Sequence, residues 1–286
     1  MNDTRRYALV DVFTETPLQG NQLGVFTDAR GLSSDVMQRL ARELNLSETV
    51  FVLPPEQGGD LRIRIFTPSA ELPFAGHPVL GAAVVMGGAL QRTTITLETG
   101  VGLVPLQLQR QNGRVTFARM RQPLPSWQPY EREAELLRAL GVERSGLPVE
   151  VYANGPQHVY VELESENAVA ALSPDMGALA ELGGVCANCF SGSATAWKTR
   201  MFAPALGVPE DPATGSAAGP LAVHLARHGR IAFGEEIKIR QGAEIGRPSV
   251  LYARAEGSAA QIERVEVGGA AVIVARGEFL QVEDLD

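Results

Sequence analysis

The sequence is poor in cysteine and has no excess of positive charge, and both features exclude classes of protein. Two cysteines among 286 residues cannot build a disulfide framework, which favours a cytoplasmic location. Lys and Arg number 25 against 33 Asp and Glu, a formal net charge of −8, so we expect no nucleic-acid partner. An apolar run long enough to cross a bilayer is absent, as is the apolar core of a signal peptide. We therefore expect no membrane partner.

The remaining composition is that of a globular protein with a real core. Hydrophobic residues make up 45% of the chain, with 30 Gly and 18 Pro, well below the glycine and proline content of low-complexity chains. Alternating or continuous apolar segments predict strands, and helical periodicity with capping residues predicts fewer helices. The Asn112-Gly113 pair predicts a hairpin turn. The predicted strands are 7–13, 23–27, 49–53, 61–66, 93–97, 103–108 and 115–120. The predicted helices are 34–44, ended by Asn45, then 79–86, 131–140, a helix opened by Ser173-Pro174 that runs to about 182, and 217–228.

A proline-rich and aromatic segment, QPLPSWQPY at 122–130, nearly halves the chain and is the best candidate for a linker. The two halves resemble each other. RIFTP at 64–68 matches RMFAP at 200–204, and each is followed by a loop, a glycine and a helix of small residues. The offset is 136 residues at the strands and 139 at the glycines. This order indicates a duplicated unit; the alternative is a coincidence of common small residues.

The two glycines, Gly76 and Gly215, would begin helices in corresponding places. A helix start presents backbone N–H groups and a positive dipole end, and a glycine lets a ligand approach closely. If both ends face one cleft, the cleft could bind a carboxylate-bearing small molecule. The alternative is that each glycine only permits tight helix packing.

Polar residues next to these features are candidates for chemistry. Glu48 precedes an apolar strand, where it is either a solvated residue or a buried acid/base whose pKa burial would raise. His77 follows Gly76 at a loop-to-helix junction, which favours a role facing a ligand. Asp211 could cap a turn, or anchor His77 or a substrate amine, with Glu210 as an exchangeable alternative. Ser216 could be a ligand or an ordinary hydroxyl at a helix start.

The other motifs give little support for a metal, redox or nucleotide-binding site. Cys186 and Cys189 form a CxxC pair, but a zinc site needs about four ligands and no second pair is present. His224 and His228 share a helix face without an HExxH pattern and are expected to be surface or packing residues. Nucleotide-binding glycine motifs are absent. We expect no metal and no cofactor.

Several stretches together carry a family resemblance: GNQLGVF, NLSETVFVL, ELPFAGHP, YANGPQHVYV, PEDPATGSAAGPLAVHLARHG and QGAEIGRPS. In these stretches the chain resembles the diaminopimelate epimerase-like superfamily and, within it, the phenazine biosynthesis isomerases of the PhzF family. The resemblance runs through the whole chain.

The resemblance implies an α+β, diaminopimelate epimerase-like fold of two pseudo-symmetric domains, each a β-barrel-like sheet around a central helix. We expect an N-terminal domain at 1–124, which the strand 276–286 could complete, a C-terminal domain at 125–275, and an active site in the cleft between them. It also implies a homodimer and no cofactor. Family positions assign Glu48 as the catalytic acid/base, His77 and Asp211 as supporting catalytic residues, and Gly76, Gly215 and Ser216 as substrate-binding residues.

Diaminopimelate epimerases use two cysteines at the helix starts, and this chain has none there. The resemblance therefore implies isomerisation of trans-2,3-dihydro-3-hydroxyanthranilate, in which one glutamate moves a proton from C3 to C1 to give an aminoketone. Three alternatives remain open at this point. They are an isomerase of another small amino or cyclic acid, a homologue that binds a small molecule without turnover, and a redox or zinc protein built on the cysteines.

Overall fold

The computed structural model describes residues 4–280 and divides the chain into two compact units. Unit 1 comprises the chain up to Arg121 together with the segment from Gly268 onward, and unit 2 comprises Gln122–Val267. The boundaries expected from the sequence were 124 and 275. Of the expected completing strand 276–286, residues 281–286 lie outside the described residues. The last strand, β17 (Ile262–Phe279), contributes its first part to unit 2 and its second part to unit 1.

The sheet of unit 1 closes into a barrel. Following its pairings, β17 joins β1, β1 joins β2, β2 joins β3, β3 joins β4, β4 joins β6, β6 joins β7, β7 joins β8, and β8 returns to β17. The β2–β3 and β4–β6 pairs are parallel, and both come with a helix in the connection. The strands are β1 (Arg5–Val12), β2 (Asn21–Phe26), β3 (Glu48–Leu53), β4 (Leu61–Phe66), β5 (Glu71–Leu72), β6 (Thr94–Thr99), β7 (Gly102–Gln111) and β8 (Arg114–Arg121).

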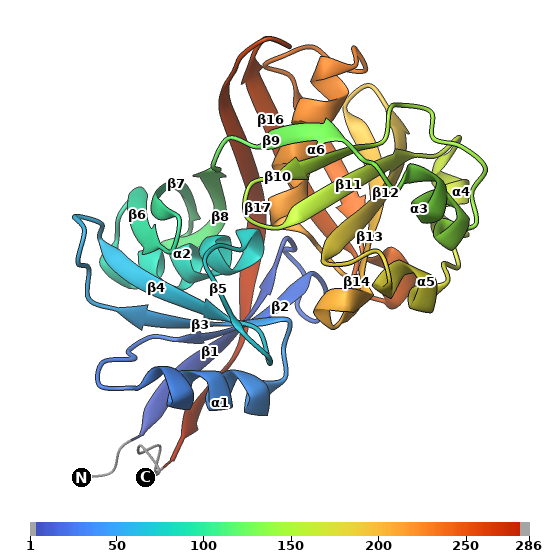
Figure 1. Cartoon of the computed structure of the whole chain (residues 1–286). Coiled ribbons are helices and arrows are strands. Elements are labelled where there is room, and N and C mark those ends of the chain that lie inside the picture. The colour runs from blue at the N-terminus through green and yellow to red at the C-terminus, as the bar shows by residue number, and fades with distance from the viewer. Residues whose placement is uncertain (1–3, 281–286) are drawn as a thin grey trace. The chain divides into compact units, whose positions relative to one another are not determined.

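Helix α2 (Gly76–Leu90) is the core of unit 1 and contacts β1, β2, β3, β6, β7 and β8 (Figure 1). Its sequence is apolar all round, which is typical of a helix that is buried on every side. Small residues let the strands approach it. A Cβ at Gly81 would lie 2.5 Å from Leu23 Cδ2 and 2.8 Å from Val12 Cγ2. The predicted helix 79–86 is thus confirmed and is longer at both ends.

Helix α1 (Ser34–Leu44) is amphipathic and lies on the outer face of the same sheet, over β3 and β4. The Ser33 side chain accepts a hydrogen bond from the Val36 amide, and Asn45 ends the helix with a left-handed φ of 50°. Both are standard helix-end devices. Its buried side chains Val36, Met37, Leu40 and Ala41 pack on Phe51, Leu53 and Phe66. The predicted helix 34–44 and its end at Asn45 are confirmed.

Unit 2 repeats the pairing scheme of unit 1. In unit 2, β10 is antiparallel to β11, β11 parallel to β12, β12 antiparallel to β13, β13 parallel to β15, and β15 antiparallel to β16. In unit 1 the corresponding series is β1, β2, β3, β4, β6 and β7. The predicted duplication is therefore present in the topology. The strands are β9 (Ser126–Pro129), β10 (Glu150–Ala153), β11 (Gln157–Glu162), β12 (Val185–Ser193), β13 (Ala196–Ala203), β14 (Val208–Asp211), β15 (Glu236–Gln241) and β16 (Ser249–Gly257).

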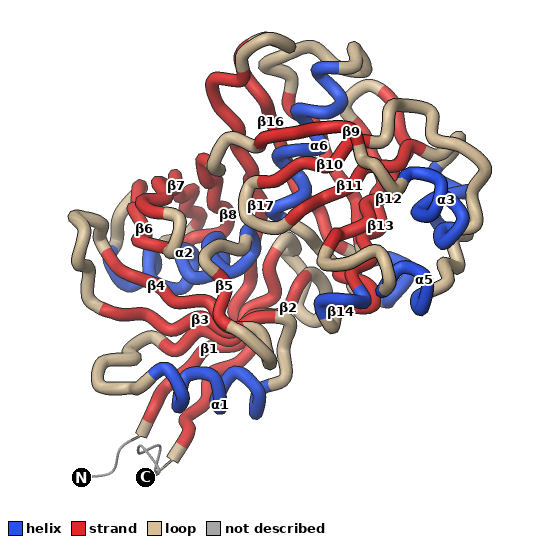
Figure 2. The backbone as a smooth tube through the Cα atoms, in the orientation of Figure 1, coloured by secondary structure: helices blue, strands red, loops and turns tan. Residues whose placement is uncertain are grey.

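Helix α6 (Gly215–Arg227) is the central helix of unit 2 and is buried along almost its whole length (Figure 2). Pro220 lies inside it and has no N–H to bond the Ser216 carbonyl. Asn154 Nδ2, in the turn after β10, replaces the missing donor and donates to Ser216 O at 3.0 Å. Tyr160 Oη of β11 donates to the next carbonyl, Ala217 O, at 2.7 Å. The proline is thus accommodated by the surrounding sheet.

The shorter helices of unit 2 are α3 (Glu133–Leu140), α4 (Glu166–Ala170) and α5 (Met176–Ala180), with two single-turn 3-10 helices at Pro204–Leu206 and Ala243–Ile245. Helices α3, α4 and α5 cover one hydrophobic cluster on the outer face of the sheet. The predicted start at Ser173-Pro174 is wrong, because Asp175 is the N-cap and accepts from the Ala178 amide. The predicted linker 122–130 is also wrong in part: its residues 126–129 form β9, which pairs with β10. None of the helices among residues 4–280 is long and apolar enough to span a membrane.

Candidate active site

Unit 1 brings Glu48 and His77 together. Glu48 is the first residue of β3, and His77 is the second residue of α2. Glu48 Oε2 lies 3.4 Å from His77 Nε2. The Glu48 side chain keeps 16% of its exposure and the His77 side chain 5%, so the carboxylate is mostly removed from water without being sealed off.

The strand periodicity explains why Glu48 points to the helix. Successive side chains of a strand alternate between its two faces. Phe51 and Leu53 face α1, so Glu48 belongs to the opposite face of β3, which is the side of α2 inside the barrel. The turn after Asn45 leaves only two residues before β3 begins, which places the carboxylate at the very start of the strand, next to the first turn of α2.

The imidazole of His77 is neutral. Burial lowers its pKa from 6.5 to about 3, and the backbone of Gln22, which raises it, does not compensate. Asn21 Nδ2 lies 3.3 Å from the other ring nitrogen, Nδ1, and orients the ring. Because the imidazole carries no charge, Glu48 and His77 do not form a fixed ion pair at neutral pH, so no cation on the ring neutralises the carboxylate.

In unit 2 Asp211 lies just before the short connection that leads to α6. It is the last residue of β14 and is buried. Its Oδ2 accepts a hydrogen bond from Thr214 Oγ1 at 2.6 Å. Gln241 holds both ends of this turn, because its Nε2 donates to the Asp211 carbonyl and to Thr214 Oγ1, while its Oε1 accepts from the Thr214 amide. The loop that ends at Gly215 is therefore fixed by side chains.

Glu210 is not interchangeable with Asp211. Neighbouring residues of β14 point to opposite faces, and Glu210 forms a two-pronged ion pair with Arg200, with distances of 2.9 and 2.8 Å. Arg200 also donates to three carbonyls at the end of α4. Glu210 thus has a structural role, and the sequence-based alternative of Glu210 for Asp211 is not supported by the geometry.

Ser216, the second residue of α6, occupies in unit 2 the helix position that His77 occupies in unit 1. Its Oγ lies 3.0 Å from His158 Nε2. Asn188 Nδ2 lies 3.4 Å from the other nitrogen of that ring, Nδ1. Burial lowers the pKa of His158 to about 3 as well. Each unit therefore contains a neutral histidine held between an asparagine amide and a candidate site residue.

Both central helices begin at the predicted glycines. Gly76 and Gly215 are the first residues of α2 and α6, and neither helix has a side-chain cap at its start. The first-turn N–H groups of both helices are thus not consumed by a capping side chain, which leaves them suited to bind an anionic group. The Gly215 carbonyl accepts from Gln122 Nε2, which fixes the start of α6.

The cysteine pair is not a metal or redox site. Cys186 and Cys189 are buried, lie three residues apart on β12 and therefore face opposite sides of the strand. They belong to different hydrophobic clusters. Burial raises the pKa of the Cys189 thiol to about 12, so this thiol is protonated and unreactive near neutral pH.

His224 and His228 gather around Glu150, and the ligand atoms of the three residues lie within 4.8 Å of one another. Arg227 Nη1 donates to the same Glu150 oxygen at 2.7 Å and supplies the positive charge that a metal would bring. Burial would raise the pKa of Glu150, yet these hydrogen bonds hold it well below its usual range. The prediction of a surface position is wrong for His224, which is fully buried against Tyr160; the prediction of a packing role is correct.

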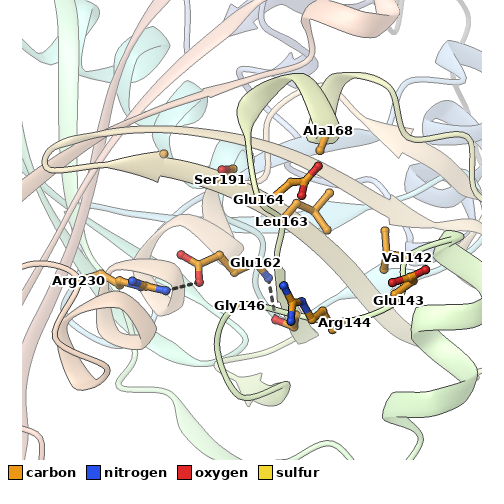
Figure 3. A pocket seen from close by; sticks show the side chains of 12 residues that line it. Val142, Glu143, Arg144, Gly146, Glu162, Leu163, Glu164, Ala168, Ser191 and Arg230 are labelled. Atoms are coloured by element: carbon orange, nitrogen blue, oxygen red, sulfur yellow. Dashed lines mark hydrogen bonds and ion pairs between the residues drawn. The ribbon is translucent and has the colours of Figure 1, made fainter.

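A cavity of about 930 Å³ opens elsewhere in unit 2, between the segment at 142–146, the end of β11 and Gly192. Two of the charged groups that line it, Arg230 and Glu162, form an ion pair of 2.6 Å (Figure 3). None of the predicted site residues lines this cavity. We therefore do not assign it to the site.

Sequence reasoning missed the residues that hold the site side chains in place. Asn21 and His158 lie in quoted motifs, GNQLGVF and ANGPQHVYV, but nothing local marks them as partners of residues more than 50 positions away. Asn188 lies between Cys186 and Cys189, and the CxxC pattern marks the cysteines and not the asparagine. Gln241 belongs to the motif QGAEIGRPS, and its partners lie 27 and 30 residues upstream.

Comparisons with known proteins identify a family and a fold for this chain. A family model described as phenazine biosynthesis-like protein (PhzC-PhzF) matches residues 10–277. A protein of Pseudomonas aeruginosa named trans-2,3-dihydro-3-hydroxyanthranilate isomerase is 54% identical over 272 residues, which cover 95% of this chain and 98% of that protein. The crystal structure of a PhzF-family phenazine biosynthesis protein from Bacillus anthracis is 26% identical, with a TM-score of 0.86 over 97% of this chain and 99% of that one. A predicted epimerase of Pseudomonas aeruginosa is 32% identical, with a TM-score of 0.80 over 96% and 99% of the two chains.

The α+β fold, with repeated units built around a central helix, is that of the epimerase-like class, as the resemblance predicted. Within that class the chain belongs to the phenazine biosynthesis-like (PhzC-PhzF) family.

Proposed function

We propose that the chain is a trans-2,3-dihydro-3-hydroxyanthranilate isomerase of phenazine biosynthesis. The observation that carries the proposal is the Glu48–His77 pair, in which a mostly buried carboxylate lies 3.4 Å from a neutral imidazole at the start of a buried helix. The 54% identity to a protein with this activity, over nearly the full length of both chains, supports it.

In the proposed reaction Glu48 acts as the single acid/base. Its carboxylate removes the proton from C3 of the substrate, the electrons shift through the ring, and the same carboxyl group returns the proton at C1. The product is an enol that becomes an aminoketone. A carboxyl group that is mostly buried but still partly accessible suits this role, because it can reach a substrate and is shielded from bulk water.

The other predicted site residues bind and orient the substrate in this proposal. The uncapped starts of α2 and α6, at Gly76 and Gly215, offer N–H groups to the substrate carboxylate. His77 and Asp211 orient the amino group and the ring, and Ser216 contributes a hydroxyl.

The decisive test follows the proton in D₂O. Wild-type protein incubated with trans-2,3-dihydro-3-hydroxyanthranilate should lose the C3 hydrogen signal in proton NMR, and Glu48→Gln should slow this by a factor of at least 10² to 10⁴, the usual contribution of a general acid/base. Binding of the aromatic analogue 3-hydroxyanthranilate, which has no C3 hydrogen to lose, should persist in the variant. Glu43→Gln, at an exposed glutamate of α1, is the matched control and should behave as wild type.

Three results would contradict the proposal. Near-normal turnover by Glu48→Gln would remove the assigned acid/base. Failure of the wild type to convert this substrate, together with hydrogen exchange in another small cyclic amino acid, would keep the chemistry and change the substrate. A protein that binds the analogue but exchanges hydrogen with no substrate would be a binding protein.

A further inference from the structure

A buried polar chain in unit 2 ends on the hydroxyl of Ser216. It starts at the backbone carbonyl of Cys186 and continues through Asn188 and His158. All three side chains involved are at least nine-tenths buried, with residual exposures of 3% for Asn188, 1% for His158 and 6% for Ser216. Polar side chains are rarely buried without a defined set of hydrogen bonds, so this chain has one preferred arrangement of its hydrogens.

The Cys186 carbonyl, at one end of the chain of hydrogen bonds, determines how the Asn188 amide is oriented. Asn188 Nδ2 lies 2.8 Å from the Cys186 carbonyl oxygen, which can only accept, so the atom facing it is the amide nitrogen and not the amide oxygen. The same nitrogen lies 3.4 Å from His158 Nδ1. A donor at this place requires an acceptor, so Nδ1 carries no hydrogen.

The position of the hydrogen on His158 determines which partner donates in the contact with Ser216. A neutral imidazole has one N–H, and with Nδ1 unprotonated the hydrogen is on Nε2. The low pKa of His158, lowered by burial to about 3, keeps the ring neutral at physiological pH. Nε2–H therefore donates to Ser216 Oγ at 3.0 Å. A lone pair of the serine oxygen is then used, and its own hydrogen remains available for another acceptor.

We propose that His158 is a positioning residue that makes Ser216 a hydrogen-bond donor and thereby directs it to the substrate carboxylate rather than to the substrate amine. An ammonium group needs an acceptor, and a carboxylate needs donors. Ser216 follows Gly215 at the start of α6, so its hydroxyl adds one oriented donor to the N–H groups of the first turn. The proposal rests on the proposed function for the identity of the ligand.

The first test reads the hydrogen position directly and needs no activity. In protein labelled with ¹⁵N-histidine, the ring shifts of His158, assigned by comparison with His158→Gln, should be those of a neutral ring with hydrogen on Nε2 at pH 7. Hydrogen on Nδ1 would overturn the proposal, because Ser216 would then donate to the histidine and offer the substrate only an acceptor.

The second test measures whether His158 acts through Ser216. His158→Phe keeps a buried ring without its hydrogen bond, and we expect the dissociation constant of 3-hydroxyanthranilate to rise about tenfold, as for loss of one hydrogen bond to a charged group. Ser216→Ala should give a similar rise, and the double variant should be no weaker than Ser216→Ala alone. In turnover, KM should rise much more than kcat falls. Additive losses in the double variant would show that His158 acts independently of Ser216 and would overturn the proposal.

Two controls keep the result decisive. His158→Gln offers an amide N–H near the position of Nε2 and should restore most of the affinity; if it does not restore any in a folded protein, the hydrogen bond is not the cause. If His158→Phe fails to fold, His158→Leu, which also lacks the hydrogen bond to Ser216, supplies the same cycle with and without Ser216→Ala.

The ligand assignment is tested with 2-aminophenol, which keeps the amine and hydroxyl but lacks the carboxylate. Ser216→Ala should leave the dissociation constant of 2-aminophenol unchanged, and this result places the Ser216 contact on the carboxylate. Equal losses for both ligands would overturn that assignment. If the protein does not catalyse the proposed isomerase reaction, the ¹⁵N experiment still tests, independently of activity, whether the His158 hydrogen is on Nε2.

Discussion

The two buried neutral histidines should make the protein lose stability as the pH falls below 6.5. The pKa of His77 in unit 1 and of His158 in unit 2 is lowered by burial from 6.5 to about 3. Between these values the unfolded chain binds a proton on each ring and the folded chain does not. The free energy of unfolding therefore rises with pH across this window and decreases on acidification.

The size of the effect follows from the two pKa values. At pH 5.5 each histidine should reduce the free energy of unfolding by about 1.4 kcal/mol relative to pH 7.5. The two together should remove about 2.8 kcal/mol if the chain unfolds in one step. Burial also lowers the pKa of His224, which acts in the same direction. Most carboxylates of the unfolded chain titrate below this range, so the histidines dominate between these two pH values.

Urea unfolding at pH 7.5, 6.5 and 5.5 provides the measurement. Substitution of one histidine isolates its share, because all other groups are common to the two proteins. His77→Asn and His158→Asn should each lose about 1.4 kcal/mol less than the wild type between pH 7.5 and 5.5. If the units unfold separately, each substitution should flatten only the transition of its own unit. A wild-type stability that is constant or increases toward pH 5.5, or variants with the same pH dependence as the wild type, would refute the neutral buried state of these rings.

Three further predictions concern stability, each measured by urea or thermal unfolding. Arg200→Met should lower the free energy of unfolding by about 3–5 kcal/mol, because it leaves Glu210 buried without its cation, and the added substitution Glu210→Gln should recover part of the loss. Gly81→Val should destabilise by about 1–3 kcal/mol, because its side chain would meet Leu23 and Val12, whereas Gly88→Ala on the same helix, with open space around it, should not. Tyr160→Phe should remove about 0.5–1.5 kcal/mol by deleting the buried hydrogen bond from its hydroxyl to the Ala217 carbonyl; an unchanged stability would show that this hydrogen bond does not stabilise the fold.

Local signals in the sequence were sufficient for much of the secondary structure. The hairpin at Asn112-Gly113 has positive φ at both residues, 52° and 79°, as its sequence predicts. Asn45 and Gly141 end helices in the left-handed conformation for the same local reason. Such devices depend on a few neighbouring residues, so one sequence is enough to recognise them.

Elements that depend on distant partners could not be predicted in the same way. Residues 126–129 are a strand because β10 lies beside them, although their prolines and aromatics suggested a linker. Helix α4 has only five residues, too few for a periodic pattern, and was not predicted. The residues of the candidate site divide in the same way, into those that a local motif marks and those that depend on distant partners. Glu48, His77, Asp211 and Ser216 are found in recognisable motifs, whereas Asn21, His158, Asn188 and Gln241 act across separations of tens of residues.

The strand registers of the two units show how the repeats have diverged chemically. Phe51 pairs with Arg64 in unit 1, and Cys189 pairs with Arg200 at the matching place in unit 2. Three residues earlier on each strand, Glu48 of unit 1 therefore corresponds to Cys186 of unit 2. The repeat thus retains a carboxylate in one unit and a buried thiol in the other. In the proposed reaction Glu48 alone transfers the proton, and the corresponding place in unit 2 holds the buried Cys186 and no carboxylate.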